Sequence, residues 1–293
     1  MAKRGVMPKR IPRHLWRWVQ VLTRVARSAY RRFNRDDGGA MAGYIAYSVF
    51  LSIFPFAIFA SALVGMLVGA EETQKVIDAL FELAPEHIAQ TIEPVLREVI
   101  GHSRGGVLTF SALAAIWIAS NAVEAVRIAF DRAYDAEEPK SFVMRRLMAI
   151  GFVFLAALTF TALGFVIILA PLGIALAEEL IGFQAPAGAW MMRYGVGIAV
   201  FVIFLFALNR WLPSNPPKWR RVVPGIFVST VLWLAGASLF SVYLAYAPSY
   251  TITYGAFAGV IVTLLFFYLT GATVIFGAEV NSALIHMGRR REA

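Results

Sequence analysis

Six long apolar runs dominate the pattern of hydrophobic and polar positions along the chain. Each run is nearly free of charge and is long enough for an α-helix to cross the ~30 Å hydrocarbon layer of a membrane. The pattern therefore predicts an all-α, polytopic membrane helix bundle with six transmembrane helices, and six crossings return the chain to the side where it starts. The expected spans are about 40–69, 107–130, 147–176, 191–212, 222–247 and 254–285.

Residues 15–33, which precede the first span, alternate with the period of an amphipathic helix. The apolar face is Leu15, Trp18, Val19, Leu22, Val25, Ala26, Ala29 and Phe33. The opposite face is basic, and it predicts an interfacial helix whose candidate contacts with anionic lipid headgroups are Arg13, Arg17, Arg24, Arg27 and Arg31. Packing of the same helix on the cytoplasmic face of the protein itself is an equally good interpretation.

The segment between the first two spans, about 70–106, is less apolar and contains Pro85 and Pro94. Its apolar positions describe two short amphipathic helices, so an external helical hairpin is expected, lying on the membrane surface or on the bundle.

The basic residues give the six spans an orientation. Of the 27 Lys and Arg residues, 23 fall in segments that the six crossings put on one side of the membrane. Nine of the 18 acidic residues fall in segments on the other side. Because basic loops stay in the cytoplasm, both termini are predicted to be cytoplasmic in a bacterial inner membrane. The expected organisation is a basic cytoplasmic segment at 1–35, a membrane domain at 36–287 and a basic cytoplasmic tail at 288–293. The net charge of +9 then reflects topology, and no nucleic-acid partner is needed to explain it.

Several kinds of chemistry have no signal in the sequence. The chain has no cysteine, its four histidines are scattered, and it contains no phosphate-binding GxxxxGK[ST] loop and no GxSxG motif. No cofactor, no metal and no enzymatic activity are therefore expected. The N-terminus also lacks the pattern of a cleavable signal peptide, so the first span should stay in the protein.

Polar residues inside the hydrocarbon layer are costly, and they are the first candidates for function. One face of the first span carries Tyr44, Tyr47, Ser48, Leu51, Ser52 and Pro55. This face could line a cavity. Alternatively, it makes hydrogen bonds between helices while the proline bends the span.

The second and sixth spans carry the other candidates. Trp117, Asn121 and Glu124 recur on one face of the second span, and Glu124 and Arg127 are spaced to pair as i,i+3. Near the cytoplasmic end of the sixth span lie Glu279, the only carboxylate of that run, and Asn281. Glu279 could be protonated, pair with an arginine from another segment or face a wet cavity.

Ordered motifs across all six spans resemble the YihY/BrkB family. They are Gly43-Tyr44-Ile45-Ala46-Tyr47, Leu51-Ser52-Ile53-Phe54-Pro55, Trp117 with Asn121-Ala122, Pro224-Gly225 before Trp233, Tyr254-Gly255, and Gly277-Ala278-Glu279-Val280-Asn281. The likeness covers about residues 25–287. It implies a bacterial inner-membrane protein with six spans and an envelope-related role. Parts of the family carry an old ribonuclease BN label, which this sequence does not support.

Three functional hypotheses follow from the residues and the resemblance. The first is non-ATP-driven transport or export of a lipid or lipid-linked substrate, with an anionic phospholipid or a lipopolysaccharide precursor as partner and a path along Tyr44, Tyr47, Ser52, Pro55, Trp117, Asn121, Glu124, Glu279 and Asn281. The second is a membrane scaffold that docks a partner through its N-terminal helix or its external hairpin. The third is a ribonuclease, which the sequence disfavours. Homo-oligomerisation is left open.

Overall fold

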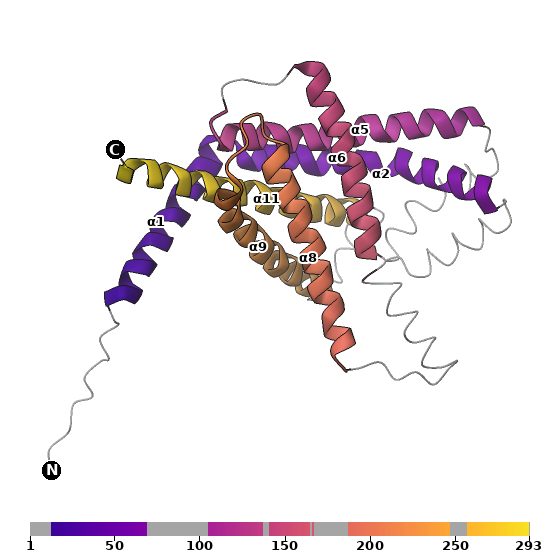
Figure 1. The fold of residues 1–293 in the computed structure, drawn as a ribbon. Coiled ribbons are helices and arrows are strands. Elements are labelled where there is room, and N and C mark those ends of the chain that lie inside the picture. The colour runs from indigo at the N-terminus through magenta and orange to yellow at the C-terminus, as the bar shows by residue number, and fades with distance from the viewer. Residues whose placement is uncertain are drawn as a thin grey trace, which may run out of the picture.

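The computed structural model describes residues 13–68, 105–136, 141–164, 166, 187–246 and 257–292. These residues form seven α-helices and no strand (Figure 1). The helices are α1 (Arg13–Arg35), α2 (Gly38–Val68), α5 (Gly105–Ala133), α6 (Phe142–Gly164), α8 (Ala187–Trp211), α9 (Trp219–Tyr246) and α11 (Phe257–Glu292).

The all-α, six-span prediction is confirmed. All the helices except α1 are long and apolar enough to cross a membrane, and each coincides with one of the six apolar runs. α2 continues through Pro55 without ending. α11 runs on to Glu292, so most of the expected tail at 288–293 is helical. The hairpin predicted for about 70–106 lies almost entirely outside the described residues.

In the turns that follow two of the helices, an aspartate backbone takes a positive φ. Asp37 follows α1 with φ of 57°, and Asp135 follows α5 with φ of 49°. Aspartate tolerates this left-handed region better than most residues because its short polar side chain can make local hydrogen bonds. The tight turn after α1 lets α2 begin at Gly38, and the turn after α5 places Asp135 close to α1.

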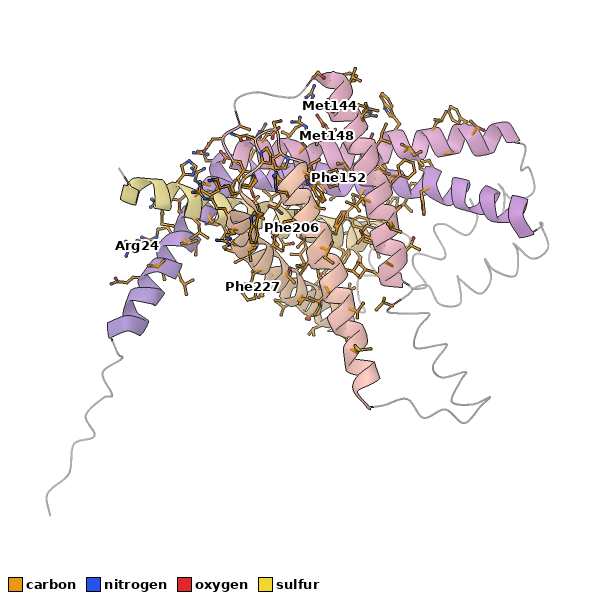
Figure 2. All side chains as sticks on the ribbon, in the orientation of Figure 1. Arg24, Met144, Met148, Phe152, Phe206 and Phe227 are labelled. Atoms are coloured by element: carbon orange, nitrogen blue, oxygen red, sulfur yellow. The ribbon has the colours of Figure 1, made fainter. Side chains whose placement is uncertain are left out.

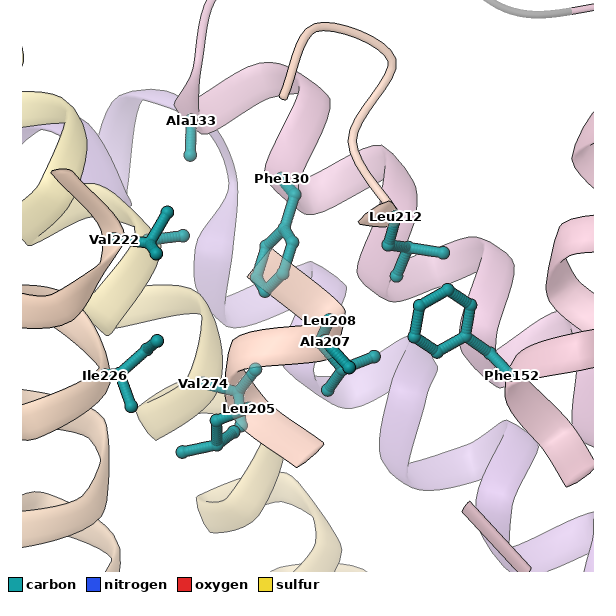
Figure 3. Packing of buried hydrophobic residues seen from close by; sticks show 11 residues of the cluster. Phe130, Ala133, Phe152, Leu205, Ala207, Leu208, Leu212, Val222, Ile226 and Val274 are labelled. Atoms are coloured by element: carbon teal, nitrogen blue, oxygen red, sulfur yellow. The ribbon is translucent and has the colours of Figure 1, made fainter. Parts of the chain in front are cut away.

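α11 is the central helix, because it packs against α1, α2, α5 and α9. A first hydrophobic cluster joins α5, α6, α8, α9 and α11, with Phe130, Leu205, Leu212 and Val222 almost fully buried (Figure 3). A second cluster fixes α2 against α5 through small residues such as Ala42 and Ala125, so these two helices approach closely. The core therefore lies where α5, α8, α9 and α11 meet.

α1 packs on the protein with part of its apolar face. Val25 and Ala29 are buried against Val280 of α11, while Leu22 on the same helix is 64% exposed. A basic helix packed on the protein itself was one of the two interpretations of this segment, and this packing agrees with it. Contact of the helix with a membrane surface stays a prediction.

The outward faces of the bundle are apolar. Met144 on α6 and Phe227 on α9 are both more than half exposed, and the same faces carry many other large exposed hydrophobic side chains (Figure 2). A continuous apolar exterior of this kind is what a lipid-exposed helix bundle requires.

Candidate functional site

The charged side chains collect at one end of the bundle, which we call the basic end. It is formed by the C-terminal parts of α1, α5, α8 and α11 and the N-terminal parts of α6 and α9, and its arginines include Arg35, Arg132, Arg145, Arg210 and Arg220. These ends come together although they lie far apart in the sequence, because the helices alternate in direction.

The polar face of α5 is a buried ion-pair network. Arg127 is 3% exposed; it donates to Glu124 Oε1 and Oε2 at 2.8 and 2.9 Å and also contacts Asp131. Asp131 in turn accepts from the backbone N–H and the hydroxyl of Ser214, at 2.7 and 2.9 Å, in the segment that joins α8 to α9. The predicted i,i+3 pairing of Glu124 with Arg127 is confirmed, and the network ties α5 to the α8–α9 connection.

Two arginines at the start of α6 cover the rest of this face. The guanidinium of Arg146 lies 3.5 Å from the centre of the Trp117 ring and donates to Asn121 Oδ1 at 3.0 Å. Arg145 reaches Glu124 at 3.3 Å. Trp117, Asn121 and Glu124 are thus brought together as predicted, and Trp117 remains 58% exposed on the outer surface.

The polar stripe on α2 does not form one environment. Tyr44 and Tyr47 are exposed on the outside of the bundle, whereas Ser48 is buried inside it. Ser52 donates to the backbone carbonyl of Val49 at 2.7 Å, within its own helix. The tyrosines can therefore meet lipid, whereas the described hydrogen bond of Ser52 stays within α2.

A second charged cluster lies where α1, α5 and α11 meet. Arg35 donates to Asp36 at 2.6 and 2.8 Å and to Asp135 at 3.2 Å, and Arg32 also reaches Asp135, at 3.3 Å. The hydrogen bonds to Asp36 raise the pKa of Arg35, so this guanidinium stays charged. His286 Nε2 lies 3.2 Å from Asp135.

A pocket of about 210 Å³ lies between α9 and α11 beside Arg220 and Arg221, and two further pockets at the basic end are lined mainly by charged side chains. The larger, of about 690 Å³, is lined by arginines and aspartates together: Arg35, Asp36, Arg127, Ile128, Asp131, Arg132, Asp135 and Ala136. The smaller, of about 360 Å³, is lined by Arg24, Arg27, Ser28, Arg31, Arg32 and Arg35. We call the smaller one the arginine pocket. In the described part of the chain, no three His, Asp or Glu side chains gather as a metal site would require.

A buried chain of hydrogen bonds connects four helical segments beneath the charged layer. The backbone N–H of Gly225 donates to Asn281 Oδ1 at 2.6 Å, and Asn281 Nδ2 donates to the hydroxyl of Tyr134 at 3.2 Å. That hydroxyl donates to Asn209 Oδ1 at 2.8 Å, and Asn209 Nδ2 donates to the carbonyl of Leu205 at 3.0 Å. Burial raises the pKa of Tyr134, so its hydroxyl keeps its proton.

Sequence reasoning singled out Asn281 but missed Tyr134 and Asn209. The only local signal for Asn209 was its position as an asparagine near the end of a predicted span. Its partner, Tyr134, is 75 residues away in the sequence. These buried hydrogen bonds give Asn281 a role in packing α11 against α9 and the end of α5.

Glu279 lies two residues before Asn281 on α11, and it is fully buried. Neither of its carboxylate oxygens has a hydrogen-bond partner. Pairing with an arginine, one of the alternatives for this residue, is therefore not formed directly, although Arg32 and Arg35 are close enough to act on its charge.

Comparison with known proteins gives a consistent result. The family model described as Virulence factor BrkB matches residues 29–293. The ribonuclease-like protein YfkH of Bacillus subtilis is 32% identical over 268 residues, which are 89% of this chain and 94% of YfkH. A UPF0761 membrane protein of Coxiella burnetii is 25% identical over 266 residues, 87% of this chain and 91% of that protein.

A UPF0761 membrane protein of Delftia acidovorans is also 25% identical, over 88% of this chain, which spans only 61% of that protein. No solved structure matches the chain. The family match covers most of the chain and agrees with the resemblance of the motifs in the six spans. The chain therefore belongs to the BrkB family of integral membrane proteins.

Proposed function

We propose that this membrane protein moves a lipid, or a lipid-linked substrate with an anionic headgroup, across the membrane without using ATP. The observation that carries the proposal is the arginine pocket. Five of its six lining residues are arginines and the sixth is Ser28, so its lining offers many donors and no carboxylate. An anionic headgroup supplies the acceptors that this lining lacks.

The chemistry of the pocket suits a phosphate group. All six lining residues lie on α1, in a stripe that runs from Arg24 to Arg35. Arginine presents a planar fork of N–H donors that matches phosphate oxygens, and arginines one turn apart on this stripe, such as Arg27 and Arg31, can bind one anion together. Arg32 and Arg35 are held in place by Asp135 and Asp36, whereas Arg27 and Arg31 form no ion pair with the described residues. The first two arginines thus give the pocket a fixed edge, and the other two are available to a ligand.

The route along the protein follows its outer surface. Tyr44 and Tyr47 on α2 and Trp117 on α5 are exposed, and Arg146 is stacked on Trp117. Tyrosine and tryptophan place an apolar ring in lipid and a polar group at its edge, so they suit the interface between acyl chains and headgroups. We propose that the headgroup passes these residues while the acyl chains stay in the membrane.

We propose that the protein lies in a bacterial inner membrane with its basic end in the cytoplasm, and the distribution of basic residues supports this orientation. In that orientation the arginine pocket takes its ligand from the cytoplasmic leaflet. Anionic phospholipids or lipopolysaccharide precursors in that leaflet fit the charge of the pocket.

Reconstitution tests the proposal. Purified protein is placed in liposomes that carry phosphatidylglycerol labelled on an acyl chain, and a membrane-impermeant reductant then bleaches the label in the outer leaflet. The label in the inner leaflet is protected from the reductant. We expect this protected fluorescence to fall faster in liposomes that contain the protein than in protein-free liposomes, with or without a pH gradient imposed. Equal loss in protein-containing and protein-free liposomes would refute transport of this lipid class.

One observation favours the scaffold hypothesis as a second candidate. The N-terminal half of α1 extends away from the other helices (Figure 1) and could dock a partner. A scaffold predicts no lipid movement in liposomes, and it predicts that deleting residues 1–35 abolishes the cellular role. We propose no catalytic activity for this chain, and incubation of the purified protein with RNA and Mg²⁺ tests that point directly, since cleavage would contradict it.

A further inference from the structure

Glu279 is a buried carboxyl group that the ion pairs of the basic end leave unsatisfied. It is 0% exposed, and neither oxygen has a hydrogen-bond partner of standard geometry, although the carboxyl group of Asp36 is close enough to interact with it. Burying an isolated ionised carboxylate costs far more than burying a neutral carboxyl group. A carboxyl group in these surroundings is therefore well placed to hold a proton.

Charged or polar groups face Glu279 from three neighbouring segments. Arg32 and Arg35 approach from α1, Asp36 from the turn between α1 and α2, and Tyr134 from the end of α5. Asp37, next to Asp36 in the same turn, is paired with Arg132. The described polar contacts of α9 with α11 in this region are uncharged: the Gly225 N–H and the Ser229 hydroxyl.

Apart from His286, the charges of this cluster balance when Glu279 is neutral. Arg32 and Arg35 carry two positive charges, and Asp36 and Asp135, to which they are bonded, carry two negative ones. An ionised Glu279 adds an uncompensated negative charge beneath them. His286, on the same helix, lies with its Nε2 3.2 Å from Asp135 and is the nearby ionisable side chain that the test must separate from Glu279.

The same two arginines also line the arginine pocket. An ionised Glu279 and an anionic headgroup therefore compete for Arg32 and Arg35. When Glu279 carries a proton, the competition disappears, and Arg32 and Arg35, still bonded to Asp135 and Asp36, contribute their positive charge to the edge of the pocket beside Arg27 and Arg31. The two sites thus share one pair of cations.

We infer that Glu279 is an exchangeable proton site, and that its proton and an anionic headgroup in the arginine pocket favour each other's binding. The inference rests on the proposed headgroup site and adds a proton as the coupled ion. The coupling is reciprocal: lower pH strengthens headgroup binding, and headgroup binding draws a proton onto the protein. Higher pH weakens headgroup binding because it favours the ionised form of Glu279.

Binding to lipid nanodiscs tests the linkage. The probe is phosphatidylglycerol in a phosphatidylcholine background, because its phosphodiester keeps its charge from mildly acidic to mildly alkaline pH. We expect the affinity of the wild-type protein to rise by about fivefold or more as the pH falls across this range. Glu279→Gln imitates the protonated form, so it should bind tightly at every pH, whereas His286→Gln should keep the pH dependence.

A second measurement does not depend on a variant that folds. Phosphatidylglycerol is added to the wild-type protein in weakly buffered solution, and a pH indicator reports proton uptake, which we expect to be absent with phosphatidylcholine alone. No uptake, or a pH dependence lost in His286→Gln but kept in Glu279→Gln, would overturn the inference. Lipid movement without linked uptake contradicts this inference alone, and linked uptake without lipid movement contradicts only the proposed transport.

Discussion

The side chain of Asn281 on α11 accepts a hydrogen bond from the backbone N–H of Gly225 on α9 at 2.6 Å, where α9 and α11 lie in close contact. A Cβ atom at Gly225 would collide with the backbone oxygen of Gly277 and with the side chain of Asn281. The contact therefore depends on the absence of a side chain at Gly225. It connects the packing of α9 and α11 with the buried hydrogen bonds that continue to Tyr134.

This close approach predicts that Gly225→Ala destabilises the protein. The added methyl group must push α9 and α11 apart, and overpacking of this kind costs about 1–3 kcal/mol. Gly151→Ala and Gly195→Ala are matched controls, because a Cβ at either position meets nothing within 4 Å. Heating in detergent followed by size-exclusion chromatography should show a lower apparent Tm for Gly225→Ala only; equal Tm values would contradict the close contact.

Removing the Tyr134 hydroxyl should also be costly. In Tyr134→Phe, the amide nitrogen of Asn281 and the amide oxygen of Asn209 lose a shared buried partner, and each unsatisfied group costs about 1–3 kcal/mol. Tyr30→Phe makes the same chemical change at a side chain that is 61% exposed. We expect the apparent Tm to fall for the first variant and to stay unchanged for the second, and the same Tm for both would argue against the buried chain.

The ion-pair network on α5 predicts a strong effect at Arg127. Arg127→Gln leaves Asp131 and part of Glu124 without their buried cation, and breaking a buried pair in this way costs about 3–5 kcal/mol. The double variant Glu124→Gln with Arg127→Gln should recover part of that loss, because one of the stranded charges is gone. Thermal stability of the single and double variants in detergent gives the comparison, and strictly additive losses would mean that the two residues do not interact.

The orientation can be tested with single cysteines, because the chain has none of its own. Ser103→Cys lies in the segment predicted to be external, and Asn215→Cys lies at the basic end, in an exposed position of the α8–α9 connection. A membrane-impermeant maleimide should label the first in intact cells and the second only after permeabilisation. The reverse pattern would place the arginine pocket on the outer side.

The sequence predicted what depends on local spacing. The apolar runs located all six spanning helices, and the i,i+3 spacing of Glu124 and Arg127 predicted their pair, because neighbours on a helix follow from its geometry. It did not predict contacts between distant segments, such as Arg32 with Asp135, since these depend on how the helices pack. The stripe on α2 shows the same limit: spacing put Tyr47 and Ser48 on one face, but packing against α5 and α11 decides which of them is buried.

The central claim is that the arginine pocket handles an anionic lipid, and the rate of lipid movement in liposomes for a pair of matched variants tests it most directly. The double variant Arg27→Gln with Arg31→Gln removes the two pocket arginines that have no described ion pair, while Arg210→Gln with Arg220→Gln removes the same charge elsewhere at the basic end. We predict that the first variant moves labelled phosphatidylglycerol at least several-fold more slowly than the wild type and that the second keeps the wild-type rate. Equal rates for both variants and the wild type would contradict the account.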